Sequence, residues 1–162
     1  MKVFGFVTVL MMIAGTFNFG CQSDSGDKSS STAQKSAQVQ GQQLSEWEIE
    51  NGIGPIKSKV ELKPIDKSLA ETGKKIFEAK CTACHKFDER YVGPPLRDVT
   101  RRRTPEFIMN QILNPDENVK QHPEGRKMLA EYLTPMTFMN VTEADARALL
   151  EYLRLEGEKS TE

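Results

Sequence analysis

The feature that most constrains this chain is a run of five residues, Cys81-Thr82-Ala83-Cys84-His85. The spacing C-x-x-C-H is typical of a covalent attachment site for a c-type haem. Each cysteine sulfur can form a thioether bond with one vinyl group of the haem, and the histidine that follows can bind the iron as an axial ligand. The motif therefore predicts one covalent haem c attached through Cys81 and Cys84, with His85 as the proximal iron ligand.

Two other kinds of site use a C-x-x-C pair, a redox dithiol and a zinc site. A thioredoxin-like dithiol needs a βαβ pattern around it, and the sequence has none. A zinc site needs two further ligands, but the only other cysteine and histidine are Cys21 and His122. Because Cys21 has a separate explanation, haem attachment is the preferred interpretation.

The overall composition limits the possible partners. The 162 residues carry a net charge of −1, so nothing in the overall charge favours binding to nucleic acid. The length predicts one domain with appendages. Two of the three cysteines belong to the haem motif, which leaves no pair for a disulfide.

The N-terminus has the pattern of an export signal. Lys2 precedes a largely apolar run from Val3 to Phe17, which is short for a membrane-spanning helix. Gly20-Cys21 at its end resembles the lipobox of bacterial lipoproteins, although Asn18 and Phe19 depart from that pattern. We therefore expect a signal peptide over residues 1–20 and a lipid anchor on Cys21, with an ordinary cleaved signal or an uncleaved anchor as alternatives. Under any of these alternatives the domain is expected to work outside the cytoplasm, and the lipid anchor would attach it to a membrane, in the periplasm or on the outer surface.

The next two segments differ in their apolar content. Residues 21–45 are polar and rich in Ser and Gln, which predicts a disordered linker. Residues 46–65 contain several apolar side chains but also Gly52, Gly54, Pro55 and Pro64, so we expect an irregular N-terminal arm that packs onto the domain. Trp47 is interpreted as an anchor for this arm.

Residues 66–156 are expected to form the folded domain, followed by a tail over residues 157–162. Helical spacing of apolar residues, together with capping patterns, predicts an all-α domain of about four helices and no strand. Ser68, with Glu71 three residues later, is the expected cap of the first helix. The predicted helices run from 68 to 80, from 105 to 113, from 123 to 133 and from 143 to 156.

Residues 66–156 resemble the small single-haem class I c-type cytochromes. Gly73 and Phe77 precede Cys81 by eight and four residues, as in the first helix of that family, where the glycine allows the last helix to cross closely. Gly93-Pro94-x-Leu96 is similar to the family's loop after the haem motif. The resemblance implies that the Pro94 carbonyl accepts a hydrogen bond from His85 and that Leu96 packs on the haem.

The distal iron ligand in this family is a methionine in a loop before the last helix. Met136 matches best, because it follows a proline and lies six residues before Thr142, the expected cap of that helix. Met139 is the main alternative, and Met128 and His122 are weaker ones. His122 is expected to lie exposed in a loop.

A His/Met-ligated haem has no open position for substrate, so the resemblance implies an electron carrier rather than an enzyme. The expected role is single-electron transfer in an extracytoplasmic respiratory chain. The stretches Tyr91-Val92-Gly93-Pro94, Arg103-Thr104-Pro105 and Asn114-Pro115 resemble those of cytochromes that accompany terminal reductases. This resemblance implies that the partner is a respiratory complex or a terminal reductase such as nitrous oxide reductase. If Met136 does not bind, the alternative is a five-coordinate haem protein that acts as a peroxidase or as a sensor of a diatomic gas.

The strongest local charge run is Arg101-Arg102-Arg103. Three interpretations remain open from the sequence: a solvated basic face, an ion pair with a haem propionate, or a docking patch for an acidic partner.

Overall fold

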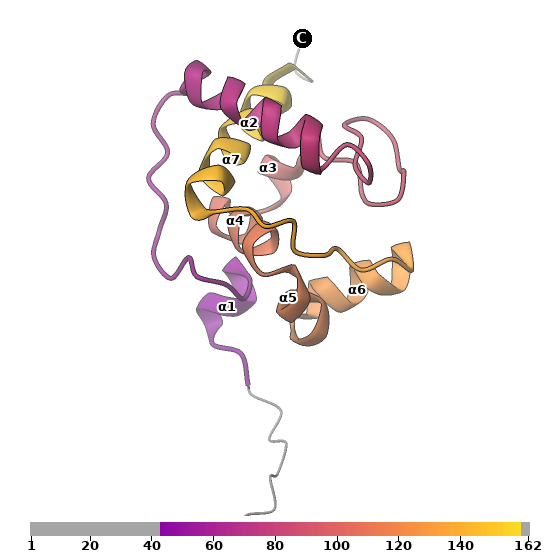
Figure 1. The fold of residues 1–162 in the computed structure, drawn as a ribbon. Helices are drawn as coiled ribbons and strands as arrows, with labels where there is room; N and C mark the ends of the chain where they lie inside the picture. Colours follow the sequence, from indigo (N-terminus) through magenta and orange to yellow (C-terminus); the bar gives the residue numbers. More distant parts are fainter. Residues whose placement is uncertain (1–42, 160–162) are drawn as a thin grey trace, which may run out of the picture. The chain divides into compact units, whose positions relative to one another are not determined.

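The computed structural model describes residues 43–159 (Figure 1). Seven helices and no strand occur in this part of the chain, which confirms the all-α prediction. They are α1 (Glu46–Asn51), α2 (Lys67–Lys80), α3 (Val99–Arg102), α4 (Pro105–Leu113), α5 (Pro115–Gln121), α6 (Pro123–Tyr132) and α7 (Glu143–Glu158). The four expected helices correspond to α2, α4, α6 and α7. The shorter α1, α3 and α5 were not predicted.

The predicted signal peptide, the lipid anchor on Cys21 and nearly all of the polar linker fall outside the described residues. No helix within residues 43–159 is long and apolar enough to cross a membrane.

Local capping interactions explain where most of the helices begin. The Thr104 hydroxyl accepts a hydrogen bond from Phe107 N at 3.1 Å, and Pro105 occupies the first position of α4. Thr142 and Asp145 form a reciprocal capping box at the start of α7. Both starts agree with the sequence prediction.

Three predicted boundaries were wrong. Asp66, not Ser68, caps α2, because its carboxylate accepts hydrogen bonds from Ser68 N and Leu69 N at 2.9 and 3.0 Å. The first part of the arm is helical, because Ser45 and Glu48 form a capping box that starts α1. At the other end, α7 continues through Gly157 to Glu158, two residues beyond the expected end of this helix.

The most extensive contact between two helices of the described residues is that of α2 with α7, which cross closely at Gly73 (Figure 1). A Cβ atom at Gly73 would lie 2.0 Å from the carbonyl oxygen of Ala148, so the two backbones touch at this point. Leu149 and Leu153 of α7 belong to the same buried core as Phe77 of α2. The close crossing expected at Gly73 is therefore present.

An aromatic cluster packs beside this crossing, close to the attachment motif. The ring centroids of Phe77 and Phe87 are 5.1 Å apart, and each ring makes an edge contact with Tyr152 at 5.5 and 5.6 Å respectively. The cluster joins α2, the loop after the motif and α7. It gives the segment that carries the cysteines a rigid support.

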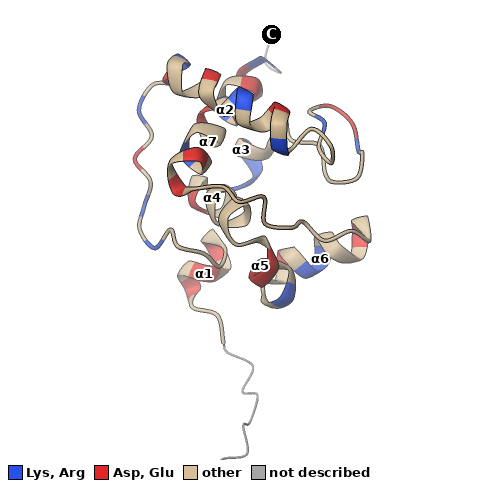
Figure 2. Ribbon diagram, viewed as in Figure 1, with Lys and Arg blue, Asp and Glu red and all other residues tan. Residues whose placement is uncertain are grey.

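Charged side chains of both signs are interspersed along the chain in Figure 2, in keeping with the small net charge.

Candidate haem-attachment site

The attachment motif forms a tight turn at the end of α2. Cys81 N donates to Phe77 O at 2.8 Å, and Cys84 N and His85 N both donate to Cys81 O, at 3.0 and 2.9 Å. Cys81 is half-buried and Cys84 is exposed. Burial raises the pKa of the Cys81 thiol to about 11, so this thiol is protonated at neutral pH before attachment.

His85 is held in one tautomer by the loop that follows it. Its Nδ1 lies 3.0 Å from the Pro94 carbonyl oxygen, which can only accept a hydrogen bond. Burial lowers the pKa of His85, and the hydrogen bond to Pro94 opposes this shift. The ring is therefore neutral at pH 7, with the proton on Nδ1 and the lone pair of Nε2 free to bind a metal.

The loop between His85 and α3 is fixed by backbone and side-chain bonds. Gly93 N donates to Cys84 O at 2.8 Å, and Leu96 N donates to Lys86 O at 3.1 Å. Arg97 binds Asp88 in the loop and the Glu156 carbonyl oxygen of α7 at 3.1 Å. The bond from Arg97 to Glu156 attaches the loop to the last helix. Leu96 of the same loop lies partly buried against the core.

The two candidate methionines have different surroundings. Met136 is half-buried, and its Sδ lies 3.7 Å from Nε2 of Gln111 on α4. Met139 is 41% exposed, and its Sδ contacts only the hydroxyl of Thr137, at 3.9 Å, among the hydrogen bonds of residues 43–159. The interior contact favours Met136 as the distal ligand.

The segment between α6 and α7, residues 133–142, contains both candidate methionines and is called the methionine loop. It is bonded to Lys80, the residue that precedes Cys81. Lys80 Nζ donates to the carbonyl oxygens of Met139 and Asn140, at 2.9 and 3.0 Å. Asn140 has a φ of 53°, in the left-handed region. The loop that holds both candidate methionines is therefore connected directly to the end of α2.

The prediction that His122 lies exposed in a loop was wrong. This histidine is 1% exposed and caps α6. Its Nε2 lies 3.0 Å from Ile49 O, and its Nδ1 accepts a hydrogen bond from Glu124 N at 3.1 Å. Both ring nitrogens are engaged within the protein, which argues against His122 as an iron ligand. Met128 lies half-buried on α6 and has no feature that favours it.

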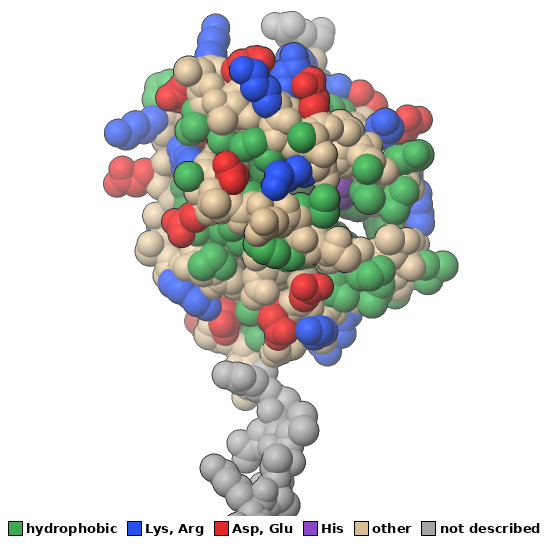
Figure 3. Space-filling view, viewed as in Figure 1, with side chains coloured by type: hydrophobic (Ala, Val, Ile, Leu, Met, Phe, Trp, Pro, Cys, Tyr) green, Lys and Arg blue, Asp and Glu red, His purple; other side chains and the backbone are tan. Residues whose placement is uncertain are grey.

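The residues present fit a covalent haem. They supply two thiols, one neutral imidazole with a free Nε2 and one thioether held from the interior. Gln111 Oε1 is buried without a hydrogen-bond partner in the described part of the chain. Figure 3 shows a hollow at the right of the molecule, bordered by hydrophobic side chains and with a histidine in its wall. Large apolar side chains left exposed in the two loops near the motif are Tyr91, Val92, Phe138 and Met139.

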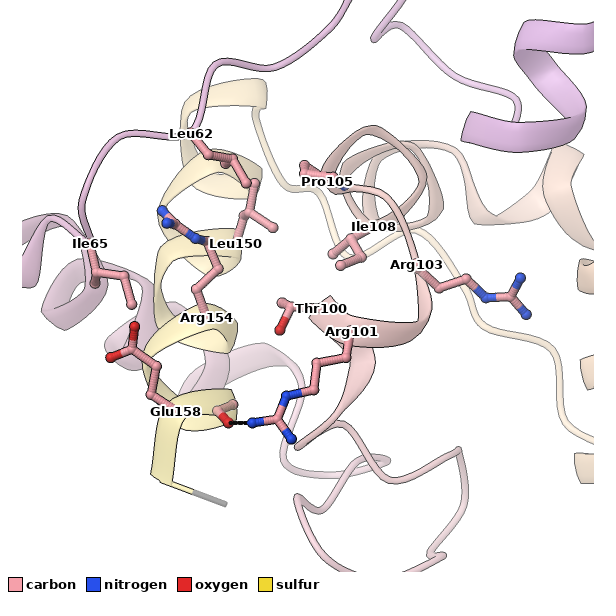
Figure 4. A pocket seen from close by; sticks show the side chains of 11 residues that line it. Leu62, Ile65, Thr100, Arg101, Arg103, Pro105, Ile108, Leu150, Arg154 and Glu158 are labelled. Atoms are coloured by element: carbon pink, nitrogen blue, oxygen red, sulfur yellow. Dashed lines mark hydrogen bonds between the residues drawn. The ribbon is translucent and has the colours of Figure 1, made fainter. Parts of the chain in front are cut away.

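The arginine run is bonded to the protein itself. Arg101 donates to Gly157 O at 3.1 Å, Arg102 donates to Pro95 O at 3.0 Å, and Arg103 pairs with Glu124. Arg101 and Arg103 also line a cavity of about 230 Å³ between the arm, α4 and α7. Figure 4 shows Arg101 reaching the end of α7 and Arg103 extending away from the cavity. No residue of the attachment motif lines this cavity, so it is separate from the haem site.

A helical domain that presents C-x-x-C-H at the end of one helix, with an oriented histidine and a methionine loop attached nearby, defines a single-haem electron-transfer protein. Comparison with known proteins agrees with this class. The sequence model of the family described as Cytochrome c matches residues 70–155. The chain therefore belongs to the cytochrome c family, as a class I c-type cytochrome that binds one covalent haem c.

Individual relatives give the same result. A "Cytochrome c-553-like" protein of Synechocystis is 32% identical over 72 residues, which cover 41% of this chain and 69% of the relative. The solved structure of a cytochrome c from Rhodothermus marinus is 46% identical, with a TM-score of 0.66, and the match covers 69% of this chain and 97% of the other. An engineered form of the Rhodothermus protein is 45% identical, with a TM-score of 0.65 and coverage of 68% and 96%.

Proposed function

We propose that this protein carries single electrons in an extracytoplasmic respiratory chain, using a haem c ligated by His85 and Met136. The observation that carries the proposal is the contrast between the two methionines. Met136 is contacted from the interior by Gln111, whereas Met139 is exposed at the surface. Two protein ligands leave no open position at the iron, which favours electron transfer over catalysis.

When bound, the haem supplies a reversible one-electron couple. The protein's part is to hold both ligands in place in each oxidation state. Pro94 orients the imidazole of His85, and this increases its basicity toward iron. Lys80 and Gln111 hold the methionine loop from two sides. The thioether is a soft ligand, so a His/Met pair raises the reduction potential relative to a His/His pair.

The proposed location follows from the N-terminal pattern. The proposed partner follows from the resemblance of the stretches around Gly93-Pro94, Thr104-Pro105 and Asn114-Pro115 to cytochromes that accompany terminal reductases. A lipid on Cys21 would attach the domain to a membrane on the periplasmic or outer surface. Cys84 and Tyr91 are exposed beside the attachment turn, where a partner could approach closely. We propose a respiratory complex or a terminal reductase, such as nitrous oxide reductase, as the partner. Mass spectrometry of the protein extracted from the membrane fraction should find a lipid on Cys21, and an unmodified Cys21 would contradict the lipid anchor.

The absorption spectrum of the ferric holoprotein tests the ligand assignment. Iron bound by a methionine sulfur should give a weak far-red charge-transfer band. Met136→Ala should abolish the band, whereas Met139→Ala should retain it and serves as the matched control. A high-spin ferric spectrum of the unsubstituted protein would contradict the proposal and would favour a peroxidase or gas sensor with an open position.

A further inference from the structure

Four buried polar side chains between residues 106 and 122 bind the backbone of the N-terminal arm. Two come from α4, one comes from α5, and one caps α6. They are Glu106, Asn110, Asn118 and His122, none of them more than 4% exposed. Buried polar side chains are costly unless they are fully hydrogen-bonded, so this arrangement stabilises one position of the arm.

Asn110 makes the largest number of these bonds. Its Oδ1 accepts a hydrogen bond from Ile56 N at 2.9 Å, and its Nδ2 donates to Asn51 O and Ile56 O at 2.9 and 3.0 Å. Asn110 is fully buried, and these partners all belong to the arm. Release of the arm would break these three bonds and expose the Asn110 amide, so docking of the arm and the position of this side chain on α4 depend on each other.

The other three side chains extend the contact along the arm. Asn118 exchanges two hydrogen bonds with the backbone of Ile53, at 2.9 and 2.8 Å. Glu106 accepts from Val60 N at 2.5 Å, and His122 Nε2 donates to Ile49 O at 3.0 Å. The arm thus holds α4, α5 and the start of α6, the three helices that lead into the methionine loop.

Gln111 connects this network to the iron ligand. It follows Asn110 on α4, and its Nε2 contacts Met136 Sδ at 3.7 Å. Its Oε1 is buried and has no hydrogen-bond partner among residues 43–159. The amide oxygen therefore does not help to fix the side chain. The position of Gln111 therefore depends on where α4 lies, and Asn110 and the arm hold that helix on one side while α7 packs against it as well.

We propose that the arm is a positioning element for Met136, and that docking of the arm and binding of iron by Met136 are coupled. Gln111 and Asn110 are the positioning residues that connect them. This inference rests on the proposed function in one respect, the identity of Met136 as the distal ligand. Coupling is reciprocal, so release of the arm weakens the methionine bond, and loss of the methionine bond loosens the arm.

Gly54→Val tests the first direction in the full-length holoprotein. A Cβ atom at Gly54 would lie 2.3 Å from Asn110 Oδ1 and 2.7 Å from its Cγ, so a larger side chain must separate the arm from α4. The far-red band should weaken, and the ferric protein should bind imidazole about tenfold more tightly, because loss of one hydrogen bond has roughly this effect. Trp47, whose Nε1 donates to Ile56 O at 3.4 Å, reports release of the arm by its fluorescence.

Three further variants separate positioning from general loss of stability. Lys57→Ala removes only an exposed ion pair of the arm with Glu48 and should change neither readout. Asp66→Ala removes the cap of α2 far from Asn110 along the chain, and should lower the unfolding midpoint without changing the imidazole affinity. Gln111→Leu should tighten imidazole binding to the same degree while Trp47 fluorescence stays unchanged.

The reverse direction needs no substitution. In the unsubstituted ferric protein, saturating imidazole should replace Met136 and accelerate hydrogen exchange at the amides of Ile53 and Ile56. Unchanged exchange at these amides would overturn the coupling. The coupling would also be overturned if Trp47 fluorescence showed release of the arm in Gly54→Val while the far-red band stayed unchanged. An unsubstituted protein without the far-red band is a different result, because it would refute the ligand assignment itself.

Discussion

Gly93 lies directly against the imidazole ring of His85. A Cβ atom built at Gly93 would stand 2.6 Å from Cε1 of the ring, so any side chain here requires the ring or the loop to shift. The next residue, Pro94, supplies a carbonyl oxygen, which accepts a hydrogen bond from Nδ1 of the ring at 3.0 Å. Two consecutive residues therefore determine where the imidazole of His85 lies, one by its lack of a side chain and one by its backbone oxygen.

Gly93→Ala should displace this ring. Either the imidazole moves or the loop moves, and both changes lengthen the Nδ1 to Pro94 hydrogen bond. Overpacking at a close contact typically costs about 1–3 kcal/mol, and we expect a loss of that size in the free energy of unfolding of the holoprotein. Denaturant titration measures it. Val92→Ala, at the adjacent exposed residue, should change stability by less than about 0.5 kcal/mol, and an equal effect of both changes would refute the explanation.

Gly73→Ala should separate α2 from α7. The added methyl group would meet the backbone of Ala148, at 2.0 Å from its oxygen, and a backbone atom cannot rotate away. We expect destabilisation of about 3 kcal/mol or more, measured by thermal or denaturant unfolding. Ser68→Ala on the exposed side of α2 is the matched control. Native stability in Gly73→Ala would show that the helices can shift apart freely.

Lys80→Ala should loosen the methionine loop. The substitution removes the two bonds from the ammonium group to the carbonyl oxygens of Met139 and Asn140. The bonds are exposed, so we expect about 1 kcal/mol of local stability to be lost, which corresponds to about fivefold faster hydrogen exchange in residues 137–141. Lys75→Ala, on the exposed surface of the same helix, should leave the exchange unchanged. Equal exchange in both variants would contradict the role of Lys80.

The ion pair between Arg103 and Glu124 should make stability depend on pH. The Arg103 guanidinium, by its hydrogen bond and its charge, holds the pKa of Glu124 below its usual value of 4.5. A lowered folded-state pKa means that the contribution is complete above about pH 4.5 and is lost as pH falls through the folded value. Because both side chains are about one third exposed, we expect less than about 1 kcal/mol.

Comparison of Arg103→Gln with the unsubstituted protein isolates this contribution. Glu48, Asp88 and Asp145 also have lowered pKa values, and their effects on stability have the same sign. They are present in both proteins and cancel in the difference. The stability difference between the two proteins should therefore shrink between pH 6 and pH 3, and a difference that is constant with pH would exclude the ion pair as its source.

Much of the fold could be predicted because its signals are local. Thr104-Pro105 and Thr142 mark helix starts through bonds within four residues, and both starts were correct. The close crossing at Gly73 followed from a resemblance that already contains the tertiary contact. Errors arose where several residues could satisfy the same local rule. Asp66 and Ser68 are both good caps, and only the backbone geometry distinguishes them.

His122 illustrates a different limit. Its flanking residues, Lys120, Gln121, Pro123 and Glu124, are polar or turn-forming, which is typical of an exposed loop. Its burial depends on Ile49, which lies 73 positions earlier and supplies the carbonyl oxygen for Nε2. The apolar surroundings come from Phe107, whose ring centroid is 5.3 Å from the imidazole. Neither contact has a sequence signal near His122.

The sequence by itself determined the chemistry of the site. Two thiols and an imidazole at C-x-x-C-H spacing predict a covalent haem, because the motif contains every protein atom that attachment requires. Only the tertiary structure decided how the rest of the chain serves that site. The pairing of Gln111 with Met136, and of Asn110 with the arm, joins residues 25 and 54 positions apart. Such contacts depend on how helices pack, and an amide side chain has the same appearance in the sequence whether it lies in water or in the core.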